Sequence, residues 1–216
     1  FEIDLNKNLY MIFDGFGGAG VGDRVASDLK SQIKDFYQKV SLDPDSTLPF
    51  FFSPSYLLEG NALINAMLYA HAELFKANEK VKISKRGGAS SIIAACSQSI
   101  LTLASIGNCC AYLVRKGRII KIFIPDDFLL ISTDDFDKHL KSMPMNAFGL
   151  FSDLRYQIKE VKIEDGDKVV LLSDGAYSRL EESQVLFAVN EESKDLKEKI
   201  NTLFKLSNTR GNLDNQ

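Results

Sequence analysis

The sequence predicts an α+β domain in which antiparallel strands and helices pack in separate layers. Four short apolar runs follow one another between residues 90 and 124, separated by turn-forming stretches instead of helices. Longer segments with the three- and four-residue spacing of helices come before and after these runs. A doubly wound parallel sheet would need strict strand–helix alternation, so the order favours an α+β domain. The length of 216 residues suits one large domain.

The first half of the chain predicts one strand and two long helices. Residues 9–13 form a short apolar strand that delivers Asp14 into a glycine-rich loop. Apolar residues then recur at helical spacing from residue 22 to about residue 40. Residues 41–54 hold three of the five prolines and three consecutive phenylalanines, which indicates a connection with aromatic side chains turned to the core. Residues 56–79 return to helical spacing.

The second half predicts an antiparallel meander, two further strands and three helices. We expect the meander strands at residues 90–96, 100–106, 111–114 and 119–124. The remaining expected elements are a short helix at 134–142, strands at 156–163 and 168–173, helices at 181–190 and 195–206, and a terminal loop at 208–216.

Composition argues against nucleic acid and membrane partners. The 26 basic and 29 acidic residues are intermixed and give a net charge of −3, so no broad basic surface is expected. The apolar stretches are far shorter than the roughly 20 residues that cross a bilayer. Three cysteines cannot all pair with one another and lack metal-site spacing, which predicts small core residues in a reducing, cytoplasmic protein.

Three aspartates predict a site for a divalent metal ion. Asp14 and Asp174 each end a predicted strand and precede a glycine, and Asp214 lies in loop text near the end of the chain. Carboxylate and backbone oxygens are ligands that Mg²⁺ and Mn²⁺ select, so the carbonyl of Gly15 is a fourth candidate. Taken alone, each Asp-Gly pair is more typical of a turn.

Several motifs together resemble the metal-dependent, or type 2C, serine/threonine protein phosphatases, in the order of that family and over nearly the whole chain. The residues that carry the resemblance are Met11-Ile12-Phe13-Asp14-Gly15-Phe16-Gly17-Gly18, Gly87-Gly88-Ala89-Ser90-Ser91, Ala104-Ser105-Ile106-Gly107-Asn108-Cys109-Cys110-Ala111-Tyr112, Leu172-Ser173-Asp174-Gly175 and Asp214-Asn215.

The resemblance implies a fold, an activity and a ligand set. The fold would be a four-layer sandwich of two antiparallel sheets flanked by helices, as one domain over residues 1–216 that lacks N-terminal and C-terminal strands of the family. Asp14 would bridge two Mn²⁺ or Mg²⁺ ions, Gly15 would bind one of them through its carbonyl, and Asp174 and Asp214 would complete the shell of the other. The activity would be hydrolysis of phosphoserine or phosphothreonine in a phosphorylated protein by water that the two ions activate. Asp14 and Asp174 would be the catalytic residues of this signalling enzyme.

Three departures from the family leave a second hypothesis open. Asn108 stands where the family has an aspartate associated with a third, looser metal ion. Phe16 replaces a histidine proposed as general acid in some relatives, and no arginine in this chain matches the family's phosphate-binding arginine. A weakly active or inactive pseudophosphatase that acts as a regulatory binding module is therefore the alternative.

A dinucleotide-binding loop is a third hypothesis. Residues 15–20 also satisfy the pattern G-x-G-x-x-G between a strand and a helix. That fingerprint requires a second parallel strand with an acidic end about 20 residues further on. A Pro/Phe-rich connection follows the helix instead, which argues against a nicotinamide or flavin enzyme.

Overall fold

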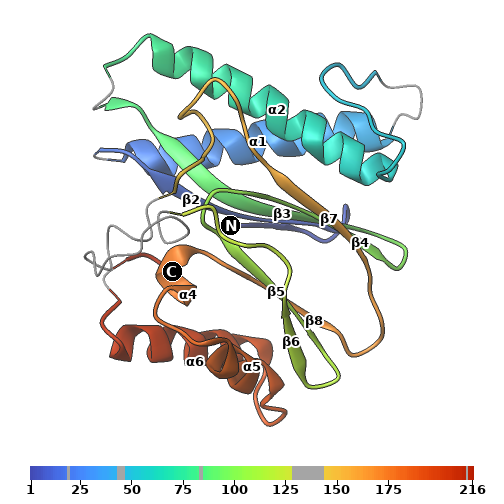
Figure 1. Cartoon of the computed structure of the whole chain (residues 1–216), viewed down its shortest axis with the longest axis vertical. Helices are drawn as coiled ribbons and strands as arrows, with labels where there is room; N and C mark the ends of the chain where they lie inside the picture. The colour runs from blue at the N-terminus through green and yellow to red at the C-terminus, as the bar shows by residue number, and fades with distance from the viewer. Residues whose placement is uncertain (19, 43–46, 83–84, 128–143, 213) are drawn as a thin grey trace.

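The computed structural model describes residues 1–18, 20–42, 47–82, 85–127, 144–212 and 214–216. Two antiparallel sheets lie face to face, and helices cover the outer face of each (Figure 1). The larger sheet has the order β1-β2-β3-β4-β7, with strands Glu2–Asp4, Leu9–Phe16, Gly88–Ser97, Ile100–Ile106 and Gln157–Lys162. The smaller sheet has the order β6-β5-β8, with strands Arg118–Lys121, Cys110–Arg115 and Lys168–Leu172. This arrangement confirms the predicted α+β sandwich.

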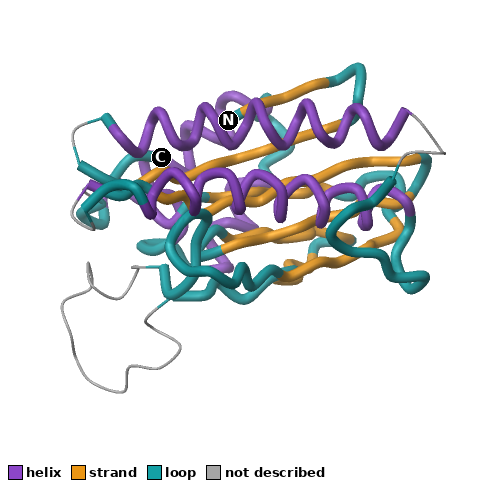
Figure 2. Tube along the Cα trace, turned by 90° about the horizontal axis from the view of Figure 1, so that it is seen from above, coloured by secondary structure: helices purple, strands orange, loops and turns teal. Residues whose placement is uncertain are grey.

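Helices form the two outer layers. The long helices α1 (Val21–Leu42) and α2 (Leu58–Glu79) run side by side over the larger sheet, as Figure 2 shows from above. The short helix α4 (Asp174–Tyr177) follows β8, and α5 (Glu182–Asn190) and α6 (Leu196–Thr209) cover the smaller sheet. Within the described residues, no helix is both long and apolar enough to cross a bilayer.

Among the described residues, apolar side chains form one core under α1 and α2, one between the two sheets and one under α5 and α6. Alternation along each strand of the larger sheet fills the first two. In β3, Ala89, Ile93 and Ala95 pack under α1 and α2, whereas Ile92 and Ala94 pack between the sheets. Successive side chains of a strand point to opposite faces, so a strand that is covered on both faces must be apolar throughout. This explains the continuous apolar run that the sequence shows there.

The smaller sheet separates the core between the two sheets from the core under α5 and α6. Cys110 and Tyr112 of β5 face α5 and α6, and Cys109 and Ala111 face the larger sheet. Cys109 and Cys110 are buried, Cys96 is half-buried, and all three are free thiols. The prediction that the cysteines are core residues is therefore confirmed for the neighbouring pair.

The predicted single meander is wrong, because its four strands form two hairpins in different sheets. The strands β3 and β4 pair in the larger sheet, and β5 and β6 pair in the smaller one. Between them the chain turns at Gly107, whose φ of +80° suits a residue without a side chain. The strand expected at 119–124 is the shorter β6, and the helix expected at 134–142 lies outside the described residues.

The dinucleotide-binding hypothesis is also wrong. The strand β2 lies between β1 and β3 and is antiparallel to both. The helix α1 that follows the glycine-rich stretch leads to α2 and not to a parallel strand. The βαβ unit that this fingerprint requires is therefore not formed around β2 in the described part of the chain.

Buried asparagines of α2 hold the preceding connection in place. The Asn65 side chain accepts the backbone N–H groups of residues 50 and 51 at 2.9 and 3.2 Å and donates to the carbonyl of residue 51 at 2.6 Å. The Asn61 side chain accepts the backbone N–H of Ser53 at 2.8 Å and donates to the backbone carbonyl of Ser53 at 2.9 Å. The connection turns Phe51 toward the core, as predicted, but leaves Phe50 and Phe52 49% and 69% exposed.

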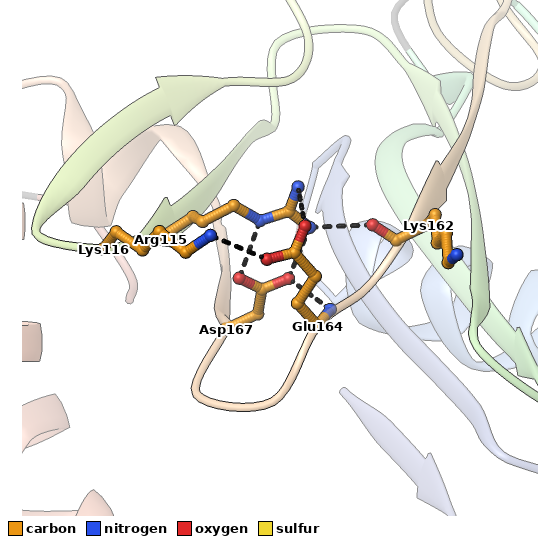
Figure 3. A network of polar contacts seen from close by, with 5 residues as sticks. All are labelled: Arg115, Lys116, Lys162, Glu164 and Asp167. Carbon is orange, nitrogen blue, oxygen red and sulfur yellow. Dashed lines mark hydrogen bonds and ion pairs between the residues drawn. The ribbon is translucent and has the colours of Figure 1, made fainter.

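An ionic cluster links the two sheets at the end of the β5–β6 hairpin (Figure 3). The guanidinium of Arg115 donates to both carboxylate oxygens of Asp167, at 2.9 and 2.6 Å, and to the carbonyl of Lys162 at the end of β7, at 2.7 Å. Glu164 adds a 3.5 Å ion pair with Arg115. This bidentate pairing holds the pKa of Asp167 at about 2.

Candidate functional site

Two predicted metal ligands meet at one end of the sandwich, one from each sheet. Asp14 lies near the end of β2, on the same face as Tyr10 and Ile12, which pack between the sheets. Asp174 follows β8 as the first residue of α4. The predicted loop placement of Asp14 is wrong, since β2 continues to Phe16 by pairing with β3. Ladder pairing holds the Asp14 backbone more firmly than a loop would.

The carboxyl groups of Asp14 and Asp174 are hydrogen-bond partners. Burial, the contact with Asp174 and the charge of Asp214 together raise the pKa of Asp14 from 3.8 to about 8. At neutral pH, without a cation, the pair therefore shares a proton. A hard divalent cation between the two carboxylates would replace that proton and balance both charges, so this donor set fits Mg²⁺ or Mn²⁺.

Hydrogen bonds fix Asp174 on both of its oxygens. The side-chain amide of Asn108 donates to Oδ2 at 3.0 Å, and the backbone N–H of Gly175 donates to Oδ1 at 2.7 Å. Asp174 and Asn108 are only 7% and 2% exposed. Two donors on one carboxyl group restrict its orientation.

Asp214 lies beside the pair but is exposed, and its Oδ1 accepts the N–H of Asn215 at 2.8 Å. A Cβ atom on Gly175 would come within 2.0 Å of the Asn215 carbonyl oxygen, so glycine lets the end of the chain lie against α4. Among the described residues, no three histidine, cysteine or acidic side chains gather closely enough to hold an ion. The structure thus brings two of the three aspartates into contact and the third near them.

Gly15 is pressed against the start of α1. A Cβ atom on Gly15 would come within 2.2 Å of the Gly22 carbonyl oxygen, and one on Gly22 within 2.5 Å of the Gly15 carbonyl oxygen. Two glycines therefore let the helix approach the strand at the predicted ligand. The Phe16 ring packs over Gly88 in the neighbouring strand, where a Cβ would meet the ring at 2.4 Å.

The sequence analysis missed Tyr177, which lies behind the site and joins α4 to the crossover between the sheets. Its hydroxyl donates to the backbone carbonyl of Asn108 across the gap between α4 and the sheet crossover. Burial raises the pKa of Tyr177 far above its usual value, and nearby Asp127 adds to the effect. The three-residue spacing from Asp174, one helical turn, is the only sequence signal for this residue.

Comparison with solved structures identifies the fold. PppA, described as a key regulatory component of T6SS in Pseudomonas aeruginosa, matches with a TM-score of 0.76 and 20% identity over 98% of this chain and 85% of that one. The Mycobacterium tuberculosis serine/threonine phosphatase PstP matches at 0.73 and 19%, over 96% and 84% of the two chains. The S. agalactiae serine/threonine phosphatase matches at 0.73 and 19%, over 95% and 83%.

No protein-family model and no curated protein sequence matches the chain. The identification therefore depends on the three-dimensional arrangement, which the solved structures share at identities of 20% and below. The same two antiparallel sheets and flanking helices that bring Asp14 and Asp174 together are the ones that match. The chain has the fold of the bacterial type 2C serine/threonine phosphatases.

Proposed function

We propose that this protein is a metal-dependent phosphatase that hydrolyses phosphoserine or phosphothreonine in protein substrates. The observation that carries the proposal is the contact between the Asp14 and Asp174 carboxyl groups, one from each sheet, in the fold of serine/threonine phosphatases. Such a pair is unfavourable without a cation, and its presence has a direct explanation if a cation binds there.

The proposed ligand set is Asp14, Asp174, Asp214 and the carbonyl of Gly15, for two Mn²⁺ or Mg²⁺ ions. A related structure, the catalytic domain of PstP, was solved in complex with two manganese ions at 18% identity, which supports this choice. When bound, two such ions supply an activated water as the nucleophile and neutralise the phosphoryl oxygens.

The residues of this chain bind and orient. The β-ladder holds the Asp14 backbone, and Asn108 and Gly175 hold the Asp174 carboxylate, so both are positioned before any ligand arrives. On the face of β2 that carries Asp14, the apolar core between the sheets contains Ile12 and, from β3, Ile92. Phe16 has no exchangeable proton, so protonation of the leaving group falls to solvent.

The alternative function is a regulatory binding module without turnover. The neutral Asn108 favours it, because an amide contributes no negative charge to the site. The contact between Asp14 and Asp174 argues the other way, since a pure interaction domain has no use for two carboxyl groups held this close.

Hydrolysis assays separate the two functions. The protein is tested on an aryl phosphate and a phosphothreonine peptide with Mn²⁺, with chelator, and as the variant Asp174→Asn. Asp28→Asn, an exposed acid on α1, is the matched control. Manganese-dependent phosphate release that Asp174→Asn abolishes and Asp28→Asn preserves is expected. Bound metal without turnover would favour the binding module, and failure to bind Mn²⁺ would refute the metal site.

A further inference from the structure

Asn108 occupies a fixed position at the point where the chain crosses from the larger sheet to the smaller one. It follows Gly107, at which a Cβ atom would come within 2.3 Å of the Ser90 hydroxyl and 2.8 Å of the Asn146 carbonyl. The N–H of Asn108 donates to the same Ser90 hydroxyl at 3.4 Å. The crossover is therefore packed on both sides, which leaves Asn108 little freedom to move.

The helix α4 binds Asn108 at two separate atoms. Its first residue, Asp174, accepts the side-chain amide of Asn108, and its last residue, Tyr177, donates to the backbone carbonyl of Asn108. Only the first contact involves the proposed metal ligand. The second holds the crossover against α4 without touching a carboxylate. Because the two contacts use different atoms of Asn108, a variant can remove one and keep the other. The first contact positions Asp174, and the second only attaches the crossover to α4.

The chemistry of the first contact depends on the amide. A carboxylate of the same shape at position 108 would face Asp174 at about the same distance with no proton to donate. Two buried carboxylates at that separation require a proton or a cation between them. The amide removes this requirement, because it supplies the donor itself and adds no charge.

We propose that Asn108 is a positioning residue for Asp174. Its amide holds the Asp174 carboxylate by a hydrogen bond, whereas a carboxylate at position 108 would make this contact only through a proton or a cation. The Asn108 amide donates to Oδ2 and the Gly175 N–H donates to Oδ1, so the Asp174 carboxylate is held at both oxygens beside Asp14. The inference rests on the proposed function to the extent that Asp174 is a metal ligand. It predicts that Asn108 sets metal affinity without binding metal.

Metal affinity tests this role without measuring turnover. Titration calorimetry with Mn²⁺ compares the wild type with Asn108→Ala and Tyr177→Phe. Loss of an outer hydrogen-bond partner of a ligand typically weakens metal binding about 10- to 100-fold, which is the change expected for Asn108→Ala. Tyr177→Phe keeps the contact with Asp174 and is expected to bind within about 3-fold of the wild type. Equal affinities for Asn108→Ala and the wild type, or equal losses in both variants, would overturn the proposal.

Melting temperatures in chelator give a metal-free test of the same contact. Asn108→Asp is expected to melt below the wild type at neutral pH and to gain more on addition of Mn²⁺. The exchanged double variant Asn108→Asp/Asp174→Asn restores an amide facing a carboxylate and is expected to recover most of the lost melting temperature. Failure of this recovery would overturn the pairing. A wild type that binds Mn²⁺ but releases no phosphate would instead count against the proposed activity alone.

Discussion

Replacing Asp14 by asparagine is expected to stabilise the metal-free protein while it removes a metal ligand. In the folded state Asp14 has a pKa of about 8, compared with 3.8 for an unperturbed aspartate. The folded protein therefore holds a proton that the unfolded chain has released. Because the folded pKa is raised, stability falls as the pH rises between these two values. Asparagine does not titrate, and its amide can donate to Asp174 in place of the shared proton.

The size of the effect follows from the pKa difference. The full difference corresponds to about 5 kcal/mol at pH 8. Asp14 is only partly buried, so water screens part of this cost, and we expect about 2 to 3 kcal/mol. In a chain of this length that is about 5 to 10 °C in melting temperature. At pH 5 the gain shrinks below about 1 kcal/mol, because both states then hold more of the proton.

The assay is thermal unfolding in chelator at pH 5 and pH 8, followed by circular dichroism. Asp28→Asn removes one exposed negative charge from α1 and controls for net charge. Addition of excess Mn²⁺ at pH 8 should reverse the order, because the wild type gains binding energy that Asp14→Asn has lost. A metal-free Asp14→Asn protein that melts at or below the wild type at pH 8 would refute the electrostatic reasoning.

Three further predictions concern the framework around the site. Arg115→Met removes the bidentate partner of Asp167. In the wild type, the lowered pKa of Asp167 means that this ion pair stabilises the fold above about pH 4 and stops doing so as the pH falls toward 2. Acid unfolding monitored by fluorescence should therefore begin at higher pH in the variant, and an unchanged acid transition would count against the link. Asn65→Ala leaves two backbone N–H groups and one carbonyl without their partner and should cost about 2 to 4 kcal/mol in urea unfolding, so a loss below about 0.5 kcal/mol would show that water replaces the side chain. Gly22→Ala places a Cβ within 2.5 Å of the Gly15 carbonyl oxygen and should weaken Mn²⁺ binding at least about 10-fold in calorimetry, whereas an unchanged affinity would exclude that carbonyl as a ligand.

Local patterns predicted the elements well, and long-range pairing was the part that they could not supply. The helical spacing over 22–40 and 56–79 gave α1 and α2 with small errors at the ends, because one apolar face packs on a sheet in each case. The turn at Gly107 has the same residue types as a hairpin turn, so the sequence could not tell that the chain passes there to the other sheet. Burial on both faces, and not strand propensity, decides that crossover.

The site shows the same division between local and long-range information. The sequence placed carboxylates after two strands, and the fold then brought Asp14 and Asp174 into contact from different sheets. The effect of Asn108 could not be predicted in this way. In the sequence, Asn108 is only a lost negative charge compared with the family's aspartate. In the folded protein its amide donates a hydrogen bond to the Asp174 carboxylate. The asparagine therefore removes a charge and satisfies a buried carboxylate at once, so its effect on metal affinity does not follow from charge alone.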